Sequence, residues 1–166
     1  MSLRESKSGV SREIPGTITN QRRYTIPVAK EAVWALISDV DAYRTWWSWL
    51  RVFEAGALRA GEEWRCEVQP PLPYPVRFRV ALEHVEGPVL VRARVSGDVV
   101  GTATLTLEDG DEGCVVCLES SLAPGNSTLR LVSRLASRIA RFGHDWVLDS
   151  GARQFIARAV APTLTD

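Results

Sequence analysis

The chain has 166 residues, of which 45% are hydrophobic, and its 20 basic side chains are balanced by 20 acidic ones. A chain of this length forms about one domain, and it buries enough surface to fold without disulfides or a structural metal. The lack of a basic excess disfavours a nucleic-acid partner, and no apolar run reaches the roughly 20 residues that cross a bilayer.

The amino-terminal residues 1–16 are polar and show no periodic pattern, so we expect a flexible tail. A single domain is predicted over residues 17–162. The tail has no apolar stretch of the kind found in secretory signals, which favours a cytoplasmic location.

One strand and two short helices are predicted next. The strand covers residues 17–26 and ends at Pro27, which lacks the backbone donor of a ladder. Apolar residues at helical spacing then predict a helix over residues 29–38. A turn and a second short helix, rich in aromatic residues, are expected within residues 39–50.

Residues 51–122 alternate between short apolar runs and turn formers, which is typical of an antiparallel meander. With the first strand, the runs predict seven strands. The six runs are Val52–Leu58, Glu62–Gln69, Val76–Val85, Val89–Ser96, Val99–Glu108 and Cys114–Ser121.

A long helix is predicted from Thr128 to about Val160, after possible N-cap oxygens at Asn126 and Ser127. Because a one-faced sheet must be covered, we expect this helix to lie across it. His144 falls on the opposite side from the predicted apolar stripe, so it is expected to point away from the sheet. The stripe consists of Val132, Leu135, Ile139, Phe142 and Trp146.

The three cysteines, Cys66, Cys114 and Cys117, are an odd number, and we expect free thiols. Cys114 and Cys117 lie three residues apart in a β-type run, where their side chains point to opposite faces. That geometry is unsuited to a shared metal. The sequence also lacks nucleotide-binding, zinc-protease and serine-hydrolase motifs, so no cofactor and no metal are expected.

The order of the elements resembles the START-related (SRPBCC) superfamily, in particular its polyketide cyclase/dehydrase-like branch. The likeness rests on residues 27–47, PVAKEAVWALISDVDAYRTWW, and on a final helix with His144-Asp145 and Gly151. It covers about residues 17–160. It implies an α+β helix-grip fold, in which a seven-stranded antiparallel curved sheet wraps the long helix and leaves an apolar cavity between them.

Strand alternation predicts which side chains face the helix. One parity of the central strands is almost wholly apolar, and the other carries charges and threonines. Such a face can line a cavity or fill a solid core, and the resemblance favours the cavity. The inward set is Trp64, Cys66, Val68, Phe78, Val80, Leu82, Val91, Ala93, Val95, Gly101, Ala103, Leu105 and Leu107.

Polar and aromatic residues on the inward side are candidates for ligand contact. Asn20 and Arg22 share the inward face of the first strand, although Arg22 can instead form an ion pair at the rim. Trp46 and Trp49 share one face of the second short helix. The predicted ligand-binding residues are Asn20, Arg22, Trp46, Trp49, Trp64, Phe78, Val80, Val91, Ala93, Leu105, Leu135, Ile139, Phe142 and Trp146.

Three functions fit this sequence. The first is binding, and transport, of a hydrophobic small molecule such as a lipid or a polyketide-like compound. The second is a polyketide cyclase/dehydratase, for which Arg22, Tyr24 and the inward-parity His84 are the candidate acid–base groups. The third is a homodimeric interaction protein that buries Trp47 or a sheet edge. A monomer or homodimer without nucleic acid or integral membrane association is expected.

Overall fold

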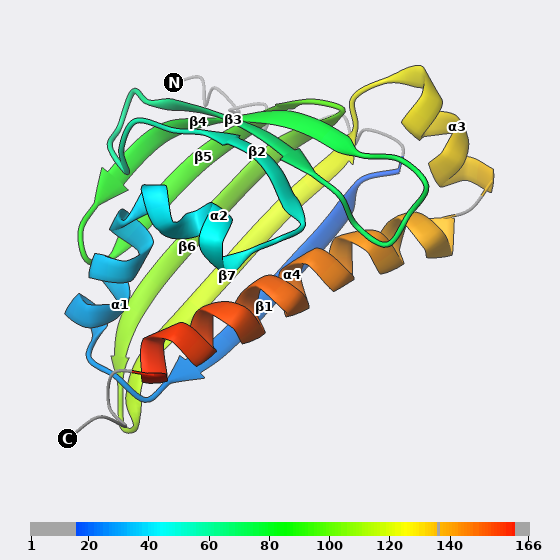
Figure 1. Cartoon of the computed structure of the whole chain (residues 1–166). Helices are drawn as coiled ribbons and strands as arrows, with labels where there is room; N and C mark the ends of the chain where they lie inside the picture. Colours follow the sequence, from blue (N-terminus) through cyan, green and yellow to red (C-terminus); the bar gives the residue numbers. More distant parts are fainter. Residues whose placement is uncertain (1–15, 136, 162–166) are drawn as a thin grey trace, which may run out of the picture.

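A seven-stranded antiparallel sheet curves around one long helix, as Figure 1 shows for this computed structural model. The structure describes residues 16–135 and 137–161, with side chains described outside residues 132–140. The predicted tail falls almost wholly outside this range. The helix-grip fold predicted from the sequence is confirmed.

The strands are ordered β1-β7-β6-β5-β4-β3-β2, so β1 and β2 form the two edges of the sheet. Each neighbouring pair is antiparallel. All seven predicted strands are confirmed, with bounds moved by a few residues. They are β1 Ile18–Ile26, β2 Leu50–Glu54, β3 Glu63–Val68, β4 Val76–Glu86, β5 Leu90–Gly97, β6 Val99–Gly110 and β7 Gly113–Pro124.

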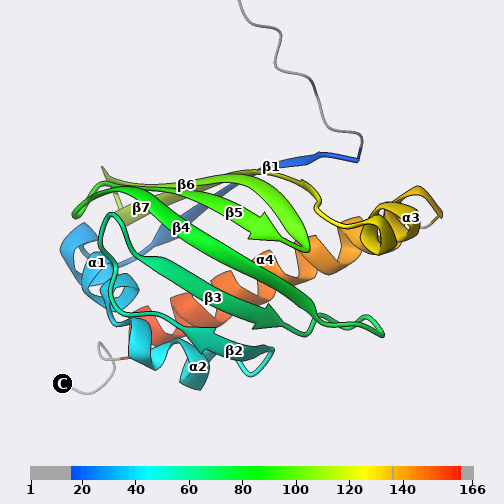
Figure 2. The same cartoon turned by 90° about the horizontal axis from the view of Figure 1, so that it is seen from above.

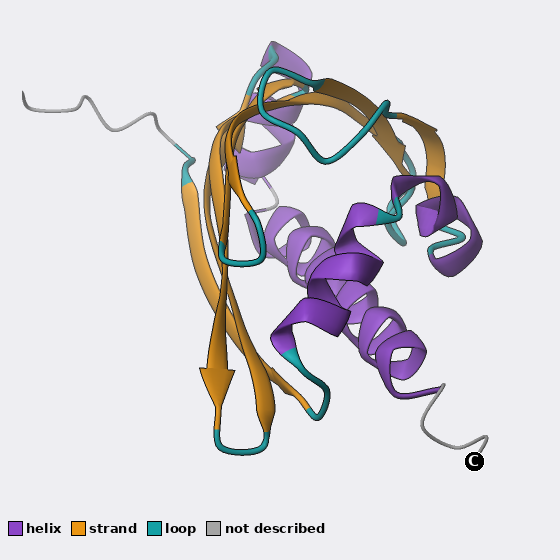
Figure 3. Cartoon of the chain, turned by 90° about the vertical axis from the view of Figure 1, so that its left-hand side faces the viewer, coloured by secondary structure: helices purple, strands orange, loops and turns teal. Residues whose placement is uncertain are grey.

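The helices occupy the concave side and the two ends of the sheet (Figure 2). Seen along the arch in Figure 3, the strands curve over the long helix α4. The helical segments are α1 Lys30–Ser38, the 3₁₀ turn η1 Val40–Ala42, α2 Tyr43–Trp46, α3 Ser127–Leu135 and α4 Ser137–Val160. No helix within the described ranges is long and apolar enough to cross a membrane.

The alternation of the central strands is confirmed. Along β5, Val91, Ala93 and Val95 are buried, whereas Arg92 and Arg94 are exposed. The same pattern places Trp64, Cys66 and Val68 of β3 in the core. The sheet therefore has one apolar concave face and one charged convex face, as a one-sided sheet requires.

His84 breaks this alternation, and its predicted inward direction is wrong. A bulge between Leu82 and His84 shifts the register, so that Leu82 pairs with Ala93 while His84 pairs with Arg92. The extra residue of a bulge moves the following side chains to the other face. The His84 side chain is 51% exposed and lies 3.6 Å from Glu86.

In place of the single carboxy-terminal helix predicted from the sequence, the described residues form α3 and α4, which run in different directions (Figure 1). Asn126 caps α3, since its Oδ1 accepts a hydrogen bond of 2.8 Å from the Leu129 amide. The Asn126 Nδ2 donates to Asp98 Oδ1 at 2.7 Å, which ties the helix start to the β5–β6 turn. The predicted N-cap at Asn126 is confirmed.

The face of the helix that meets the sheet differs from the prediction. Phe142, expected inside, is 56% exposed, whereas His144, expected outside, is half-buried. The two residues lie about 160° apart around a helix, so one cannot face the sheet if the other does. The predicted stripe members Val132, Leu135 and Ile139 lie outside the described side chains.

The three cysteines are free thiols, as expected. Cys114 is buried and Cys117 is half-buried, on opposite faces of β7. Burial raises the pKa of Cys66 to about 12. Among the described residues, no group of three or more His, Cys, Asp or Glu side chains could hold a metal ion.

Candidate functional site

Polar contacts attach α4 to the edge strand β1. Arg22 Nη2 lies 3.2 Å from Asp145 Oδ1, and Arg22 Nε lies 3.5 Å from Asp149 Oδ1. Asn20 Nδ2 donates a 3.1 Å hydrogen bond to Asp145 Oδ1. Asn20 and Arg22 thus point inward as predicted, and both contact the helix.

Two tryptophans attach α4 to the opposite edge, next to β2. Trp47 Nε1 donates to the Gly151 carbonyl oxygen at 3.1 Å, and Trp49 Nε1 donates to Gln154 Oε1 at 3.2 Å. The ring of Trp49 also packs against Trp146 at a centroid distance of 6.4 Å. The helix therefore bridges both edges of the half-barrel and closes its open side.

The pairing of the tryptophans corrects the prediction that Trp46 and Trp49 share a face. Helix α2 ends at Trp46, and Trp47 is already extended. Trp47 and Trp49 instead flank a turn, in which the Leu50 backbone N–H donates to the Trp47 carbonyl oxygen at 3.1 Å, and their rings stack at 5.6 Å. Trp46 instead packs against Phe155 of α4.

An apolar pocket of about 330 Å³ lies between the concave sheet and the amino-terminal half of α4. Its walls come from every strand except β2, from α3, from α4 and from the β3–β4 loop, and a volume of this order is typical of small-molecule sites. No lysine, arginine, aspartate or glutamate occurs among the described residues that line it. Prominent wall residues are Phe78, Val80, Ala103, Leu118, Val147 and Leu148.

The β3–β4 loop, residues 69–75, covers one end of this pocket. The Gln69 side-chain Nε2 donates to the Leu72 carbonyl oxygen at 2.9 Å, and the Gln69 backbone N–H donates to the Trp49 carbonyl oxygen at 2.8 Å. Leu72 lies over Gly143, where an added Cβ would come within 2.6 Å of Leu72 Cδ1. Glycine at 143 therefore permits the loop to pack closely on α4.

A second apolar pocket of about 260 Å³ lies under the carboxy-terminal half of α4. Leu118, Val147 and Leu148 line both pockets, so these residues stand between them. The second pocket has an aromatic wall that includes Trp47 and Trp49. Tyr24, Tyr43 and Phe155 complete this aromatic lining.

Three buried polar side-chain atoms at these pockets have no hydrogen-bond partner within the described part of the chain: Tyr24 Oη, Ser120 Oγ and His144 Nδ1. Burial raises the pKa of Tyr24, and the charge of Asp149 acts in the same direction. Burial lowers the pKa of His144 from its ordinary 6.5, against the opposing effect of Asp145. Both groups are therefore neutral near pH 7.

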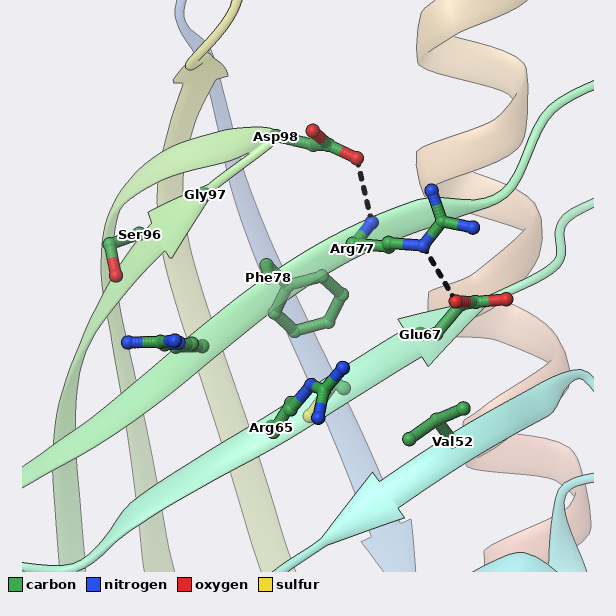
Figure 4. A pocket seen from close by; sticks show the side chains of 10 residues that line it. Val52, Arg65, Glu67, Arg77, Phe78, Ser96, Gly97 and Asp98 are labelled. Carbon is green, nitrogen blue, oxygen red and sulfur yellow. Dashed lines mark hydrogen bonds and ion pairs between the residues drawn. The ribbon is translucent and has the colours of Figure 1, made fainter.

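A hollow of a different kind, about 390 Å³, lies on the convex face of the sheet (Figure 4). It is bordered by side chains of both charges. Arg77 Nε lies 2.7 Å from Glu67 Oε2, and the Arg77 amide donates to Asp98 Oδ2 at 2.8 Å. This hollow combines charged side chains with apolar ones such as Val52 and Phe78, whereas the described linings of the two pockets under α4 contain no lysine, arginine, aspartate or glutamate.

The predicted ligand-binding residues fall into several groups. Phe78 and Val80 line the first pocket, and Trp49 and Leu105 line the second. Trp46, Trp64, Val91 and Ala93 pack in the neighbouring core, while Asn20 and Arg22 contact Asp145. Trp146 packs on Trp49, Phe142 is exposed, and the side chains of Leu135 and Ile139 are not described.

The sequence reasoning missed several wall residues of the first pocket, chiefly Leu72, Tyr74, Ser120 and His144. Ser120 lies on the same parity of β7 as Cys114 and Val116, so extending the alternation rule to β7 would have found it. The loop residues gave no periodic signal.

Comparison with known proteins supports this architecture. TTHA0849 from Thermus thermophilus has a similar structure, with a TM-score of 0.71 at 17% identity over 88% of this chain and 98% of that chain. A protein from Rhizobium leguminosarum has a TM-score of 0.62 at 14% identity, over 86% of this chain and 95% of that one. Ara h 8.0201 has a TM-score of 0.61 at 8% identity, over 87% and 99%.

These similarities concern the fold, because all three identities are low. No curated protein sequence matches the chain. A family model does match it, over residues 17–147. This match confirms the resemblance noted in the sequence. The chain belongs to the family described as polyketide cyclase / dehydrase and lipid transport.

Proposed function

We propose that this protein binds a hydrophobic small molecule, of the lipid or polyketide-like class, in the pockets under α4. The observation that carries the proposal is the 330 Å³ pocket, whose described lining has no charged side chain of the lysine, arginine, aspartate or glutamate type. Apolar surface around such a volume favours a guest that loses contact with water. The family description, which includes lipid transport, agrees with this role.

The direct test is the composition of the purified protein. Native mass spectrometry and organic extraction are expected to reveal a co-purifying apolar compound. Ala103→Phe places a ring in the first pocket and is expected to reduce its occupancy by about tenfold or more, because an overfilled cavity excludes the guest. Thr102→Phe, on the exposed face of the same strand, is the matched control.

Two results would contradict the proposal. One is protein that takes up no apolar compound even when mixed with lipid extract and naphthalene. The other is equal occupancy in the Ala103→Phe and Thr102→Phe variants, because the guest would then lie outside the first pocket, which carries the proposal.

The cyclase/dehydratase alternative is less well supported. Its three candidate groups do not meet, since His84 lies on the convex face while Tyr24 lines the second pocket. Arg22 is occupied by Asp145 and Asp149. Ring-closing chemistry needs a proton acceptor and a donor at one substrate, and these three residues do not provide such a pair.

The homodimer alternative through Trp47 is also less well supported. The Trp47 indole donates to Gly151 within the same chain, and its ring stacks on Trp49. A residue committed to these contacts is poorly placed to anchor a partner. A cytoplasmic location and a monomeric or homodimeric state stay predictions from the sequence.

A further inference from the structure

Tyr74, Ser120 and His144 are the polar side chains in the otherwise apolar wall of the first pocket. Among the described residues, Ser120 and His144 each have a buried polar atom without a hydrogen-bond partner. Ser120 of β7 is only 8% exposed, and its Oγ has no hydrogen-bond partner among the described residues. Ser120 lies on the concave face, opposite Ala103 of β6 in the strand register. A buried hydroxyl without a partner is unfavourable, so this oxygen is expected to be satisfied by something that enters the pocket.

His144 of α4 lines the same pocket from the helix side. Its side chain is 17% exposed, and its Nδ1 is also buried without a partner in the described part of the chain. The neighbouring Asp145 Oδ1 is 3.7 Å away, too far for a hydrogen bond. That carboxylate oxygen instead accepts from Asn20 and Arg22.

Charge decides which polar group can enter. The described lining holds no lysine or arginine, and the nearby Arg22 is already paired with Asp145 and Asp149. A carboxylate or phosphate would lose its hydration there without gaining a counter-charge. Burial lowers the pKa of His144, so the imidazole is neutral near pH 7 and supplies no positive charge. A neutral oxygen, by contrast, needs only hydrogen bonds.

We propose, building on the proposed function, that the first pocket selects neutral apolar compounds carrying a hydroxyl or carbonyl oxygen, which hydrogen-bonds to Ser120 Oγ and His144 Nδ1. A serine hydroxyl donates or accepts, and a neutral histidine has one donor and one acceptor nitrogen. A ligand hydroxyl can therefore accept from Ser120 and donate to His144. A carbonyl oxygen can accept from both. Fatty-acid carboxylates are disfavoured.

Three probes of similar shape separate these possibilities: naphthalene, 2-naphthol and 2-naphthoate, titrated at about pH 7.5, where 2-naphthol is neutral and 2-naphthoate is ionised. The wild-type protein is expected to bind 2-naphthol at least about tenfold more tightly than naphthalene, a difference of about 1.4 kcal/mol. It is expected to bind 2-naphthoate more weakly than 2-naphthol.

The variants connect this preference to the two residues. Ser120→Ala combined with His144→Leu is expected to keep naphthalene binding and to lose the preference for 2-naphthol. Ser120→Ala alone removes a single oxygen atom, and it is expected to lose part of the preference even if the double variant folds poorly. Ser121→Ala changes the next residue of β7, which is on the opposite parity, and is expected to behave as wild type.

The outcomes of this experiment distinguish failure of the selectivity inference from failure of the proposed function. If wild-type protein binds naphthalene and 2-naphthol equally, or binds 2-naphthoate as tightly as 2-naphthol, the selectivity inference is overturned while the apolar pocket stands. A preference that survives both the single and the double substitution also overturns it. If none of the three probes binds, this inference is overturned, and the proposed function falls with it only when the protein also takes up no apolar compound from lipid extract.

Discussion

Arg22 of β1 and Asp145 of α4 are 123 residues apart in sequence, yet Arg22 Nη2 lies 3.2 Å from Asp145 Oδ1. The contact joins an edge strand to the helix that closes the sheet. Both side chains are about one-third exposed, at 33% and 36%, so solvent weakens the attraction. Its main effect is to fix the position of α4 over the pockets.

Replacing Arg22 should therefore weaken the closure of the helix. Arg22→Met keeps the aliphatic stem and is expected to lower the free energy of unfolding by about 1 kcal/mol. In a double-mutant cycle with Asp145→Asn, a coupling of roughly 0.5–1 kcal/mol is expected from urea unfolding. The control is Arg23→Met on the opposite face of β1. Zero coupling would show that the ion pair does not hold the helix.

The opposite edge gives a second prediction. Trp47→Phe removes the hydrogen bond to the Gly151 carbonyl, which lies in a partly buried contact, while Trp49→Phe removes one to Gln154 at an exposed position. Both substitutions delete the same atoms. Because a buried hydrogen bond contributes more, Trp47→Phe should cost about 1 kcal/mol more than Trp49→Phe in urea unfolding. An equal loss of stability in the two variants, or a larger loss in Trp49→Phe, would contradict the role of the Trp47–Gly151 hydrogen bond in holding the helix.

The contact between Gly143 and Leu72 gives a third prediction. Alanine is favoured over glycine inside a helix by about 1 kcal/mol, but a methyl group at 143 would meet Leu72 at 2.6 Å. Gly143→Ala should therefore stabilise the Leu72→Ala variant by about 1 kcal/mol and the wild type by less. Urea unfolding of the four proteins measures this difference. The same gain in both backgrounds would mean that the loop does not press on the helix.

A fourth prediction concerns pH. The pKa of His144 is lowered by burial, with Arg22 and Arg141 acting in the same direction and Asp145 opposing them. Below about pH 6.5, His144 therefore binds a proton more readily in the unfolded chain than in the folded protein. The free energy of unfolding consequently decreases as the pH is lowered. His144→Gln lacks this proton uptake.

Urea unfolding of wild type and His144→Gln between about pH 7.5 and pH 5.5 tests the fourth prediction. The difference in unfolding free energy between the two proteins should be constant near the upper end of this pH range. As the pH falls through about 6.5, the wild type should lose stability relative to His144→Gln. Parallel curves over the whole range would place His144 in contact with solvent.

The strands could be predicted because their signals are local. Turn formers such as Gly97-Asp98 bound each run, and alternation assigns a face to residues such as Val91 and Ala93. A bulge escapes this rule. The apolar Leu82 and the polar His84 have the same parity in the sequence, and only the register of β4 against β5 shows that they face opposite sides.

The orientation of α4 could not be predicted for a different reason. Its sheet-facing side includes Gly143, Gly151 and Ala152, which carry little hydrophobic signal, whereas Phe142 and Trp146 lie elsewhere on the helix. Apolar side chains thus occur around much of its circumference, and although Phe155 lies on the buried face, Phe142 and Trp146 do not mark it. Helices α3 and α4 also run in different directions (Figure 1), so a stripe drawn across both has no single direction.

The pockets themselves depend on how distant elements are spaced. Alternation identifies Ala103 and Leu118 as inward, but a packed core and a lined cavity require the same pattern. The height of α4 above the sheet is set by Asp145 on one side and Gly151 on the other, through contacts with β1 and with Trp47. Such long-range contacts have no local signature in the sequence.

The most direct measurement is a crystal structure of the protein soaked with 6-bromo-2-naphthol, with bromine located by its anomalous signal. The bromine is expected between the concave sheet and α4, in the space bordered by Ala103 and Val147, with the naphthol oxygen within hydrogen-bond distance of Ser120 or His144. A helix packed directly against these strands, with no space between them and no bromine there, would contradict the binding role.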